Sequence, residues 1–318
     1  MKTYLSYKHF FNWKFISSIF ISIVFSFYAF NRFDLNRFID ILYDINYLSV
    51  LLAVALLIFV VYIRALRWKL LFSDQSISVK KLFESQMVGY FGNNILPLRL
   101  GEGLRCFFLS KRSETGFPYI FGTVILERFL DMLGLVLLGS ILFFVEFDFI
   151  DVYDNTYFIY LIFIIVIVML SVSFYFNSAL KNYNSYNRLV NVLNDIIKGF
   201  QSLSSKNIFS ILLYTLLIWS LYVVEVYLIQ NSMSLDLSLL DCILILFISS
   251  LALSIPSAPA NIGTFEAGVI YGMGLIGVFA LEIEFAIILH AVTFFPYTIL
   301  GGILFMFYNY KLFNSNHK

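Results

Sequence analysis

Long apolar runs, separated by short polar connections, recur along the whole chain. A membrane-spanning helix needs about 20 mainly apolar residues, and on that criterion the pattern predicts eight spans. The predicted spans cover residues 15–30, 47–66, 117–145, 157–176, 207–229, 240–256, 263–281 and 284–309. We therefore expect an all-α, polytopic integral membrane helix bundle that forms a single domain over residues 1–318, with no soluble domain.

The composition supports a lipid environment. Of the 318 residues, 60% are hydrophobic and 13% are charged, whereas a soluble domain is typically about 45–50% apolar and about 25% charged. The net charge of +1 creates no global field that would attract nucleic acid. The two cysteines, Cys106 and Cys242, have no metal-ligand spacing, and no motif of a known enzyme class is present. We expect no cofactor, no bound metal and no catalytic residue.

Lysine and arginine predict the orientation of the chain, because they concentrate in cytoplasmic loops. With a cytoplasmic N-terminus, the inside segments are 1–14, 64–112, 177–206 and 311–318, and they hold eighteen of the twenty-one Lys and Arg residues. The first apolar run lacks a small-x-small cleavage site, so it is predicted to be a retained span. We expect a multi-pass protein of the plasma (inner) membrane, with both termini in the cytoplasm.

One stretch leaves the topology open. Between Asn207 and Tyr310 there is no Lys or Arg, so the charge rule requires only an even number of crossings there. Four spans satisfy this requirement, and so do two spans with a re-entrant hairpin.

Two segments resemble interrupted helices. They cover residues 89–105 and 254–268, where glycine and proline weaken or break an α-helix. Lipid tolerates such backbone only where it is buried in protein or lines a watery cavity, so one or two re-entrant or broken helices are expected. The residues that mark them are Gly92, Asn93, Asn94, Pro97 and Gly101 in the first segment, and Pro256, Pro259, Gly263 and Gly268 in the second. Their loose similarity permits an internal repeat, and corresponding broken segments point to a transporter's binding site.

Basic residues close the second predicted span. Arg64, Arg67 and Trp68 fit an anchor at the headgroup level of the membrane. The same group fits an anionic lipid phosphate, because the planar guanidinium binds two oxygens at once.

Three charged residues surround the first broken segment. If the chain after Pro97 resumes a helix, Arg99, Glu102 and Arg105 share one face. This face is either a self-paired cytoplasmic surface or a cavity wall, and the apolar, glycine-rich surroundings favour the cavity wall.

Glu127, Arg128 and Asp131 interrupt the third predicted span. They lie roughly 15–21 Å along the helix, near the middle of the bilayer, where charge is costly. Arg128 and Asp131 are spaced to pair, which leaves Glu127 for another helix. The alternatives are a structural ion network and a functional site.

Three further titratable residues lie in later spans. Glu225 is expected near the outer interface. Glu266 needs a partner from another helix, and Arg99, Arg105 or Arg128 are the candidates. His290 is expected to make a polar contact and not to act as a base.

These residues together resemble the lysylphosphatidylglycerol synthase transmembrane region family, which is described as flippase-like. The resemblance covers nearly the whole chain. It rests on five motifs: Arg64-x-x-Arg67-Trp68, Gly92 to Arg105, Glu127-Arg128-x-x-Asp131, Pro259 to Gly268, and Tyr297 to Gly302. Pro259-Ala260-Asn261 departs from the Pro-Gly-Gly form that the family often shows.

The resemblance implies a polytopic domain with re-entrant elements that moves a modified phospholipid across the membrane. Because the aminoacyl-transferase domain of the bifunctional relatives is absent from this sequence, aminoacylation is not carried over. The expected partner is a membrane lipid, either an anionic phospholipid or a lipid-linked sugar, while a homo-oligomer or a membrane enzyme partner stays open. We expect the headgroup to contact Arg64, Arg67, Arg99, Glu102, Arg105, Glu127, Arg128, Asp131 and Glu266. The alternatives are an intramembrane lipid-modifying enzyme and an accessory subunit of a glycosyltransferase system.

Overall fold

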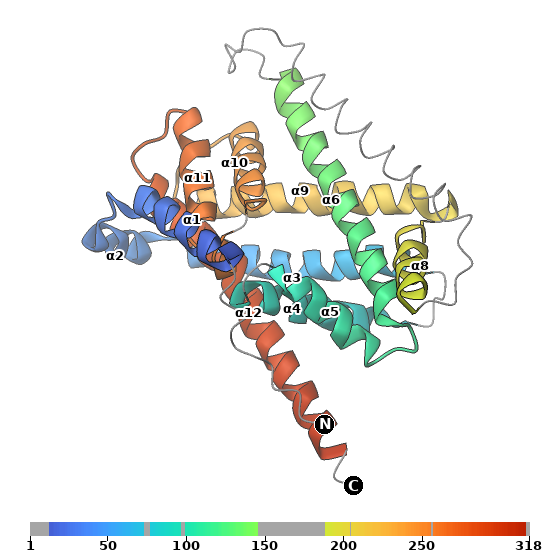
Figure 1. The fold of residues 1–318 in the computed structure, drawn as a ribbon. Coiled ribbons are helices and arrows are strands. Elements are labelled where there is room, and N and C mark those ends of the chain that lie inside the picture. The colour runs from blue at the N-terminus through green and yellow to red at the C-terminus, as the bar shows by residue number, and fades with distance from the viewer. Residues whose placement is uncertain are drawn as a thin grey trace.

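The structure is a computed structural model that describes residues 13–72, 77–96, 99–145, 188–203, 205–255 and 257–315. This part of the chain contains eleven α-helices and no strand (Figure 1). The α-helices are α1 (Trp13–Phe30), α2 (Leu35–Asp44), α3 (Tyr47–Lys69), α4 (Val79–Ile95), α5 (Gly101–Ser110), α6 (Phe117–Val145), α8 (Arg188–Phe200), α9 (Ile208–Ser232), α10 (Leu239–Ala252), α11 (Thr264–Leu275) and α12 (Glu282–Ser315). Short 3-10 turns, η3 (Ser205–Asn207) and η4 (Pro259–Asn261), precede α9 and α11.

Helices α3, α9 and α12 are long and apolar enough to cross a membrane. Helix α6 has 29 residues and carries Glu127, Arg128 and Asp131 near its middle. The prediction of an all-helical membrane protein is confirmed, while the number of spans stays a prediction. The predicted span 157–176 lies outside the described residues.

Helices α3 and α9 run side by side in opposite directions (Figure 1). At one end, Asn46 N donates to Ser232 O at 2.9 Å, and at the other Asn207 Nδ2 donates to Leu70 O at 3.3 Å. Apolar side chains of α3, α9, α10, α11 and α12 form the larger core, and a second core surrounds Trp68 between α3, α4, α5 and α6.

Both broken segments fold back as helical hairpins. Helices α4 and α5 cross closely because Gly101 lies against the backbone of Gly89, where a Cβ at Gly101 would overlap the Gly89 carbonyl oxygen. Helices α10 and α11 pack in the same way, and a Cβ at Gly268 would lie 2.6 Å from the Cβ of Ala252. Small residues at such contacts let helix backbones approach.

The second hairpin corrects the predicted spans in this region. Helices α10 and α11 have 14 and 12 residues, so each is about 18–21 Å long and shorter than the hydrocarbon core of about 30 Å. The predicted span 263–281 is wrong in length, because the helix ends at Leu275. Which of the two topologies left open by the sequence the chain adopts stays a prediction.

Two amphipathic helices were not predicted from the apolar runs, because each is short and half polar. Helix α2 exposes Leu35, Ile39 and Tyr43 on one face, and packs Phe38 and Leu42 against the core. Helix α8 packs against α6, where Gly122 and Gly199 allow backbone contact.

Candidate functional site

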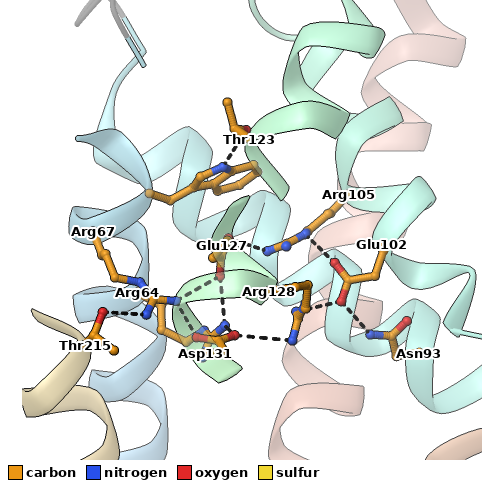
Figure 2. Close-up of polar contacts among 11 residues, drawn as sticks. Arg64, Arg67, Asn93, Glu102, Arg105, Thr123, Glu127, Arg128, Asp131 and Thr215 are labelled. Carbon is orange, nitrogen blue, oxygen red and sulfur yellow. Dashed lines mark hydrogen bonds and ion pairs between the residues drawn. The ribbon is translucent and has the colours of Figure 1, made fainter. Parts of the chain in front are cut away.

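Seven charged side chains from three helices meet inside the protein (Figure 2). We call them the arginine–carboxylate cluster. Its members are Arg64 and Arg67 of α3, Glu102 and Arg105 of α5, and Glu127, Arg128 and Asp131 of α6. All seven were expected from the sequence to serve one site, and the structure brings them together.

Glu127 and Asp131 lie one turn apart on α6 and face α3. Arg64 Nη2 lies 2.8 Å from Glu127 Oε1 and 2.6 Å from Asp131 Oδ2. Arg67 Nη2 lies 2.6 Å from Asp131 Oδ1 and 3.6 Å from Glu127 Oε1. The other oxygen of Glu127 accepts from Arg105 Nη1 at 3.1 Å. Glu127 therefore joins α3 and α5 to α6. The sequence predicted that Glu127 would find its partner on another helix.

Glu102 forms the second half of the cluster. Its Oε2 lies 2.9 Å from Arg105 Nε, and its Oε1 lies 2.6 Å from Arg128 Nη2. Asn93 Nδ2 of α4 also approaches Glu102 Oε1, at 3.4 Å. The predicted pair of Arg128 and Asp131 is present at 3.4 Å, but both residues have shorter contacts elsewhere. The pair is one link of a network.

Burial differs across the cluster. The side chains of Arg67 and Glu127 are fully buried, whereas that of Arg128 is 40% exposed. Glu102 and Asp131, its partners, are partly exposed. The cluster is thus closed on the α3 side and open at Arg128.

The charges of the cluster do not cancel. Four arginines against three carboxylates leave a formal charge of +1. Several buried guanidinium nitrogens have no hydrogen-bond partner among the described residues, namely Arg105 Nη2 and the Nε atoms of Arg64, Arg67 and Arg128. Buried donors usually find acceptors, so the cluster has capacity for one more anionic group.

Neutral side chains fix the cluster in place. Trp68 Nε1 donates to Thr123 Oγ1 at 3.0 Å, and the guanidinium of Arg105 lies 4.9 Å from the centre of the Trp68 ring. Arg67 Nη1 donates to Thr215 Oγ1 of α9 at 3.1 Å. Neither threonine was predicted to belong to the site, because a lone Thr in an apolar helix has no distinguishing pattern.

Arg64, Arg67 and Trp68 are all buried. A headgroup-level anchor exposes its cations and indole to the membrane interface. The anchor interpretation is therefore wrong for these residues, which instead serve the cluster.

Arg99 departs from the expectation that it shares a helical face with Glu102 and Arg105. Helix α5 begins only at Gly101, and Arg99 has a φ of 55°, which is uncommon for a residue with a side chain. Its Nη2 donates to Leu253 O, just after α10. Arg99 therefore ties the first broken segment to the end of α10, directly before the second broken segment.

Other residues of the first broken segment serve packing. Gly92 lies against Gly101 and Leu104. Asn94 Nδ2 donates to Phe294 O at 3.1 Å and to Thr298 Oγ1 at 2.6 Å, which holds α4 against α12. Pro97 and Pro256 lie outside the described residues.

The second broken segment adopts left-handed backbone at three positions. Ala260 and Asn261 each have a φ of 58°, and Gly263 has a φ of 88°. Ala260 and Asn261 thus adopt, without glycine, a backbone conformation that favours glycine. A Cβ at Gly263 would also lie 2.7 Å from Ser22 O of α1.

Glu266 does not join the arginine–carboxylate cluster. Its partner is His290, whose Nδ1 lies 2.6 Å from Glu266 Oε1. None of the candidates Arg99, Arg105 and Arg128 is paired with it among the described contacts. The expectation that an arginine neutralises Glu266 is wrong, because the start of α11 directs this side chain towards α12.

Glu225 is also inside the protein, while its expected depth near the outer interface of the membrane stays a prediction. It is buried, and its Oε1 accepts from Thr293 Oγ1 at 2.8 Å. Within the described residues, no group of three or more His, Cys, Asp or Glu side chains could hold a metal ion.

Comparisons with known proteins agree with this architecture. The family described as "Lysylphosphatidylglycerol synthase TM region" matches residues 15–301. A UPF0104 membrane protein of Methanocaldococcus jannaschii is 37% identical over 101 residues, and one of Pyrococcus horikoshii is 34% identical over 98 residues. These matches span 30% and 29% of this chain, and the same shares of the two relatives. No solved structure matches the chain.

Proposed function

Because the chain belongs to the lysylphosphatidylglycerol synthase TM region family, we propose that it binds an anionic membrane lipid and moves its headgroup across the bilayer. The headgroup is that of an anionic phospholipid or of a lipid-linked sugar phosphate. It passes through a protein-lined polar groove at the arginine–carboxylate cluster, while the tails stay in lipid.

The observation that carries this proposal is the excess positive charge of the cluster together with its unpaired donors. A phosphate offers several acceptor oxygens and a negative charge, and guanidinium binds such oxygens in pairs. One phosphate monoanion makes the cluster neutral overall. It also supplies acceptors to donors such as Arg105 Nη2.

The carboxylates have a separate role in this proposal. Isolated arginines are costly inside a membrane, so Glu102, Glu127 and Asp131 keep them paired when no lipid is bound. Arg128 is the entry point, because its side chain is the most exposed of the cluster. An arriving headgroup takes the place of Glu102 or Asp131 as the partner of the Arg128 guanidinium.

A surface groove between α3 and α12 supports a lipid as the ligand. It has a volume of about 480 Å³ and an apolar lining that includes Val54, Ile58, Phe295 and Ile299. Pro296 lies in the same wall. A hydrocarbon chain fits such a surface on two spanning helices, and it buries apolar area there.

The proposal places the protein in the inner membrane as a single domain, with both termini in the cytoplasm. The distribution of lysine and arginine supports this orientation. In this orientation the arginine end of α3 lies towards the cytoplasmic leaflet.

Reconstitution into liposomes tests the proposed function. Purified protein is incorporated into vesicles that carry a fluorescent anionic phospholipid, and the label in the outer leaflet is followed by chemical quenching. We expect the protein to accelerate redistribution between leaflets and to leave the lipid's mass unchanged. A change of mass would instead identify a lipid-modifying enzyme. Neither change would contradict transport and favour an accessory subunit.

A further inference from the structure

One face of α12 lies between two buried carboxyl groups that belong to two other helices. His290 and Thr293 are three residues apart and share this face. His290 contacts Glu266 of α11, and Thr293 contacts Glu225 of α9. We call Glu225, Glu266, His290 and Thr293 the α12 titratable site.

Glu266 and His290 form a short, enclosed contact. Glu266 Oε1 lies 2.6 Å from His290 Nδ1, and Glu266 Oε2 accepts from Gly263 N at 2.8 Å. Phe265 and Phe294 pack on the imidazole, with ring centroids 5.1 Å and 4.3 Å away. Both partners are buried, so the charge of this pair is poorly screened by water.

Glu225 has only a neutral partner. Thr293 Oγ1 donates to it at 2.8 Å, and no Lys or Arg forms an ion pair with it among the described residues. The stretch from Asn207 to Tyr310, which contributes all four residues of the site, contains no Lys or Arg at all. An ionised Glu225 is therefore costly at this depth unless a mobile cation or a proton neutralises it.

The titratable groups around the site come from every helix packed against it. Glu225 interacts electrostatically with Tyr222 of α9 and Tyr297 of α12. Beyond these two lie Tyr90 of α4 and Arg64 of α3, which interact with both tyrosines. Of the helices that contact α9, α10 carries the buried Cys242 and the capping residue Asp241, and α6 carries Glu127, Arg128 and Asp131 of the arginine–carboxylate cluster. No charged side chain of α1 is described.

The two charged sites of the protein therefore differ in kind. The arginine–carboxylate cluster holds guanidinium groups, which stay charged at any physiological pH. The α12 titratable site holds two carboxyls and an imidazole, whose charges depend on bound protons. Without added protons and with a neutral imidazole, the α12 site carries two negative charges, and two protons bring it to neutrality.

We propose that the α12 titratable site binds protons and couples their passage to movement of the lipid headgroup. This inference rests on the proposed function. It names a proton gradient as the energy source of transport, because protons can bind to and leave the second buried site of the fold.

The contacts supply a physical link between the two sites. The Glu266–His290 contact holds α11 against α12. The α10–α11 hairpin accepts the hydrogen bond of Arg99 at Leu253 O, and Arg99 lies three residues before Glu102 of the cluster. A change of charge at Glu266 thus acts on a hairpin that touches the entrance of the arginine–carboxylate cluster.

The position of the α12 titratable site favours proton uptake from the outer side of the membrane. His290 lies about 12 Å along α12 from Glu282, and Glu225 lies about 10 Å before the end of α9. The start of α12 meets α2, because Arg37 Nε lies 3.6 Å from Glu284 Oε1, and the end of α9 lies beside Asn46, which follows α2, because Asn46 N donates to Ser232 O. Arg64, in contrast, lies about 8 Å from the opposite end of α3. In the predicted orientation, the proton site is in the outer half and the arginine cluster in the inner half.

Liposomes with an imposed pH gradient test the coupling. The variants are Glu225→Gln and Glu266→Gln, which remove a proton-binding group with little change of shape. Glu282→Gln is the matched control, because it lies on the first turn of α12 and outside the site. We measure the leaflet distribution of a fluorescent anionic phospholipid and the pH of the vesicle lumen together.

For the wild type and Glu282→Gln, a gradient of one pH unit should change the leaflet distribution by up to about tenfold per coupled proton, with matching movement of protons. Glu225→Gln and Glu266→Gln should lose at least most of this response and retain gradient-independent lipid binding. Equal responses in all four proteins would overturn the coupling. The coupling would also be overturned if a sodium gradient at constant pH changed the leaflet distribution as much as the pH gradient does.

Infrared spectroscopy separates a failure of the coupling from a failure of the lipid function. Titration of the purified protein should reveal a protonated buried carboxyl band that disappears in Glu225→Gln and persists in Glu282→Gln. If this band titrates but the wild type moves no lipid under any gradient, the proposed lipid function is wrong and proton binding stands. If lipid moves but no carboxyl band titrates, the proton site is wrong.

Discussion

Arg105 of α5 lies 3.1 Å from Glu127 of α6, although the two residues lie on opposite sides of the sharp turn between these helices. Both side chains are buried. Their contact joins the first broken segment to the charged face of α6, and Arg64 extends it to α3 on the other side of Glu127. Glu127 is therefore the centre of the arginine–carboxylate cluster.

Replacement of Glu127 should destabilise the protein strongly. Glu127→Gln leaves four arginines against two carboxylates, and removal of one partner from a buried ion pair costs about 3–5 kcal/mol. Thermal unfolding in detergent measures the effect. Asp195→Asn is the control, because Asp195 pairs with Lys198 on the exposed side of α8 and an exposed pair contributes about 0–1 kcal/mol. Equal stability of the two variants would contradict the central role of Glu127.

The contacts of Asp131 predict unequal coupling to two of its three arginine partners, Arg67 and Arg128. Asp131 lies 2.6 Å from Arg67 but 3.4 Å from Arg128, and Arg128 is partly exposed. Double-mutant cycles with alanine should therefore give a larger interaction energy for Arg67 and Asp131 than for Arg128 and Asp131. The interaction energy is measured from the folded yield and the unfolding temperature of each variant in detergent. Simple additivity in both cycles would mean that the cluster is not coupled.

Two glycines of α5 provide a matched test of the first hairpin. A Cβ at Gly101 would overlap the backbone of Gly89 and Asn93, whereas a Cβ at Gly103 meets nothing within 4 Å. Gly101→Ala should separate α4 from α5 and abolish lipid movement. Gly103→Ala should leave movement intact and stabilise α5 by about 0.5–1 kcal/mol, through the better helix propensity of alanine. Equal lipid movement and equal stability of the two variants would contradict the close contact of α4 and α5 at Gly101.

The sequence identified the members of the arginine–carboxylate cluster because intramembrane charge is costly and must find partners. It identified only the partners that lie three residues apart on one helix, namely Arg128 with Asp131 and Glu102 with Arg105. Spacing along one helix suggested Arg128 with Asp131, but helix packing gives Asp131 to Arg64 and Arg67 as well. Contacts between distant helices leave no trace in local spacing.

Glu266 illustrates the same limit. A lone carboxylate in an apolar stretch indicated that a partner was needed, and arginine was the expected type. The direction of α11 depends on the left-handed backbone at Ala260, Asn261 and Gly263. Only glycine signals such a conformation reliably, so the contact with His290 could not be predicted.

Helices α2 and α8 were missed for another reason. Both are too short and too polar for a criterion based on about 20 apolar residues. Their apolar residues recur at helical spacing, which is the pattern of a helix in the membrane interface.

Cysteine labelling tests the predicted orientation. Both native cysteines are buried, so a membrane-impermeant thiol reagent should react only with introduced probes. Asp40→Cys, on the exposed polar face of α2, should be labelled from outside intact cells. Lys198→Cys, on the exposed face of α8, should be labelled only after the membrane is opened. The reverse pattern would invert the topology.

If the arginine–carboxylate cluster binds an anionic lipid headgroup, substitutions of Arg128 should change the affinity for that lipid. Arg128→Gln removes the most exposed cation and makes the cluster neutral, while Arg128→Lys keeps the charge without the planar fork. Lys198→Gln removes an exposed cation elsewhere.

The measurement is the affinity of each purified protein for a short-chain anionic phospholipid and for a zwitterionic lipid of the same chain length. We expect Arg128→Gln to weaken anionic-lipid binding about tenfold, which corresponds to about 1.4 kcal/mol. We also expect an intermediate effect for Arg128→Lys, no effect for Lys198→Gln, and no change for the zwitterionic lipid. Equal affinities of the wild type and Arg128→Gln for the anionic lipid would contradict binding of the headgroup by the arginine–carboxylate cluster.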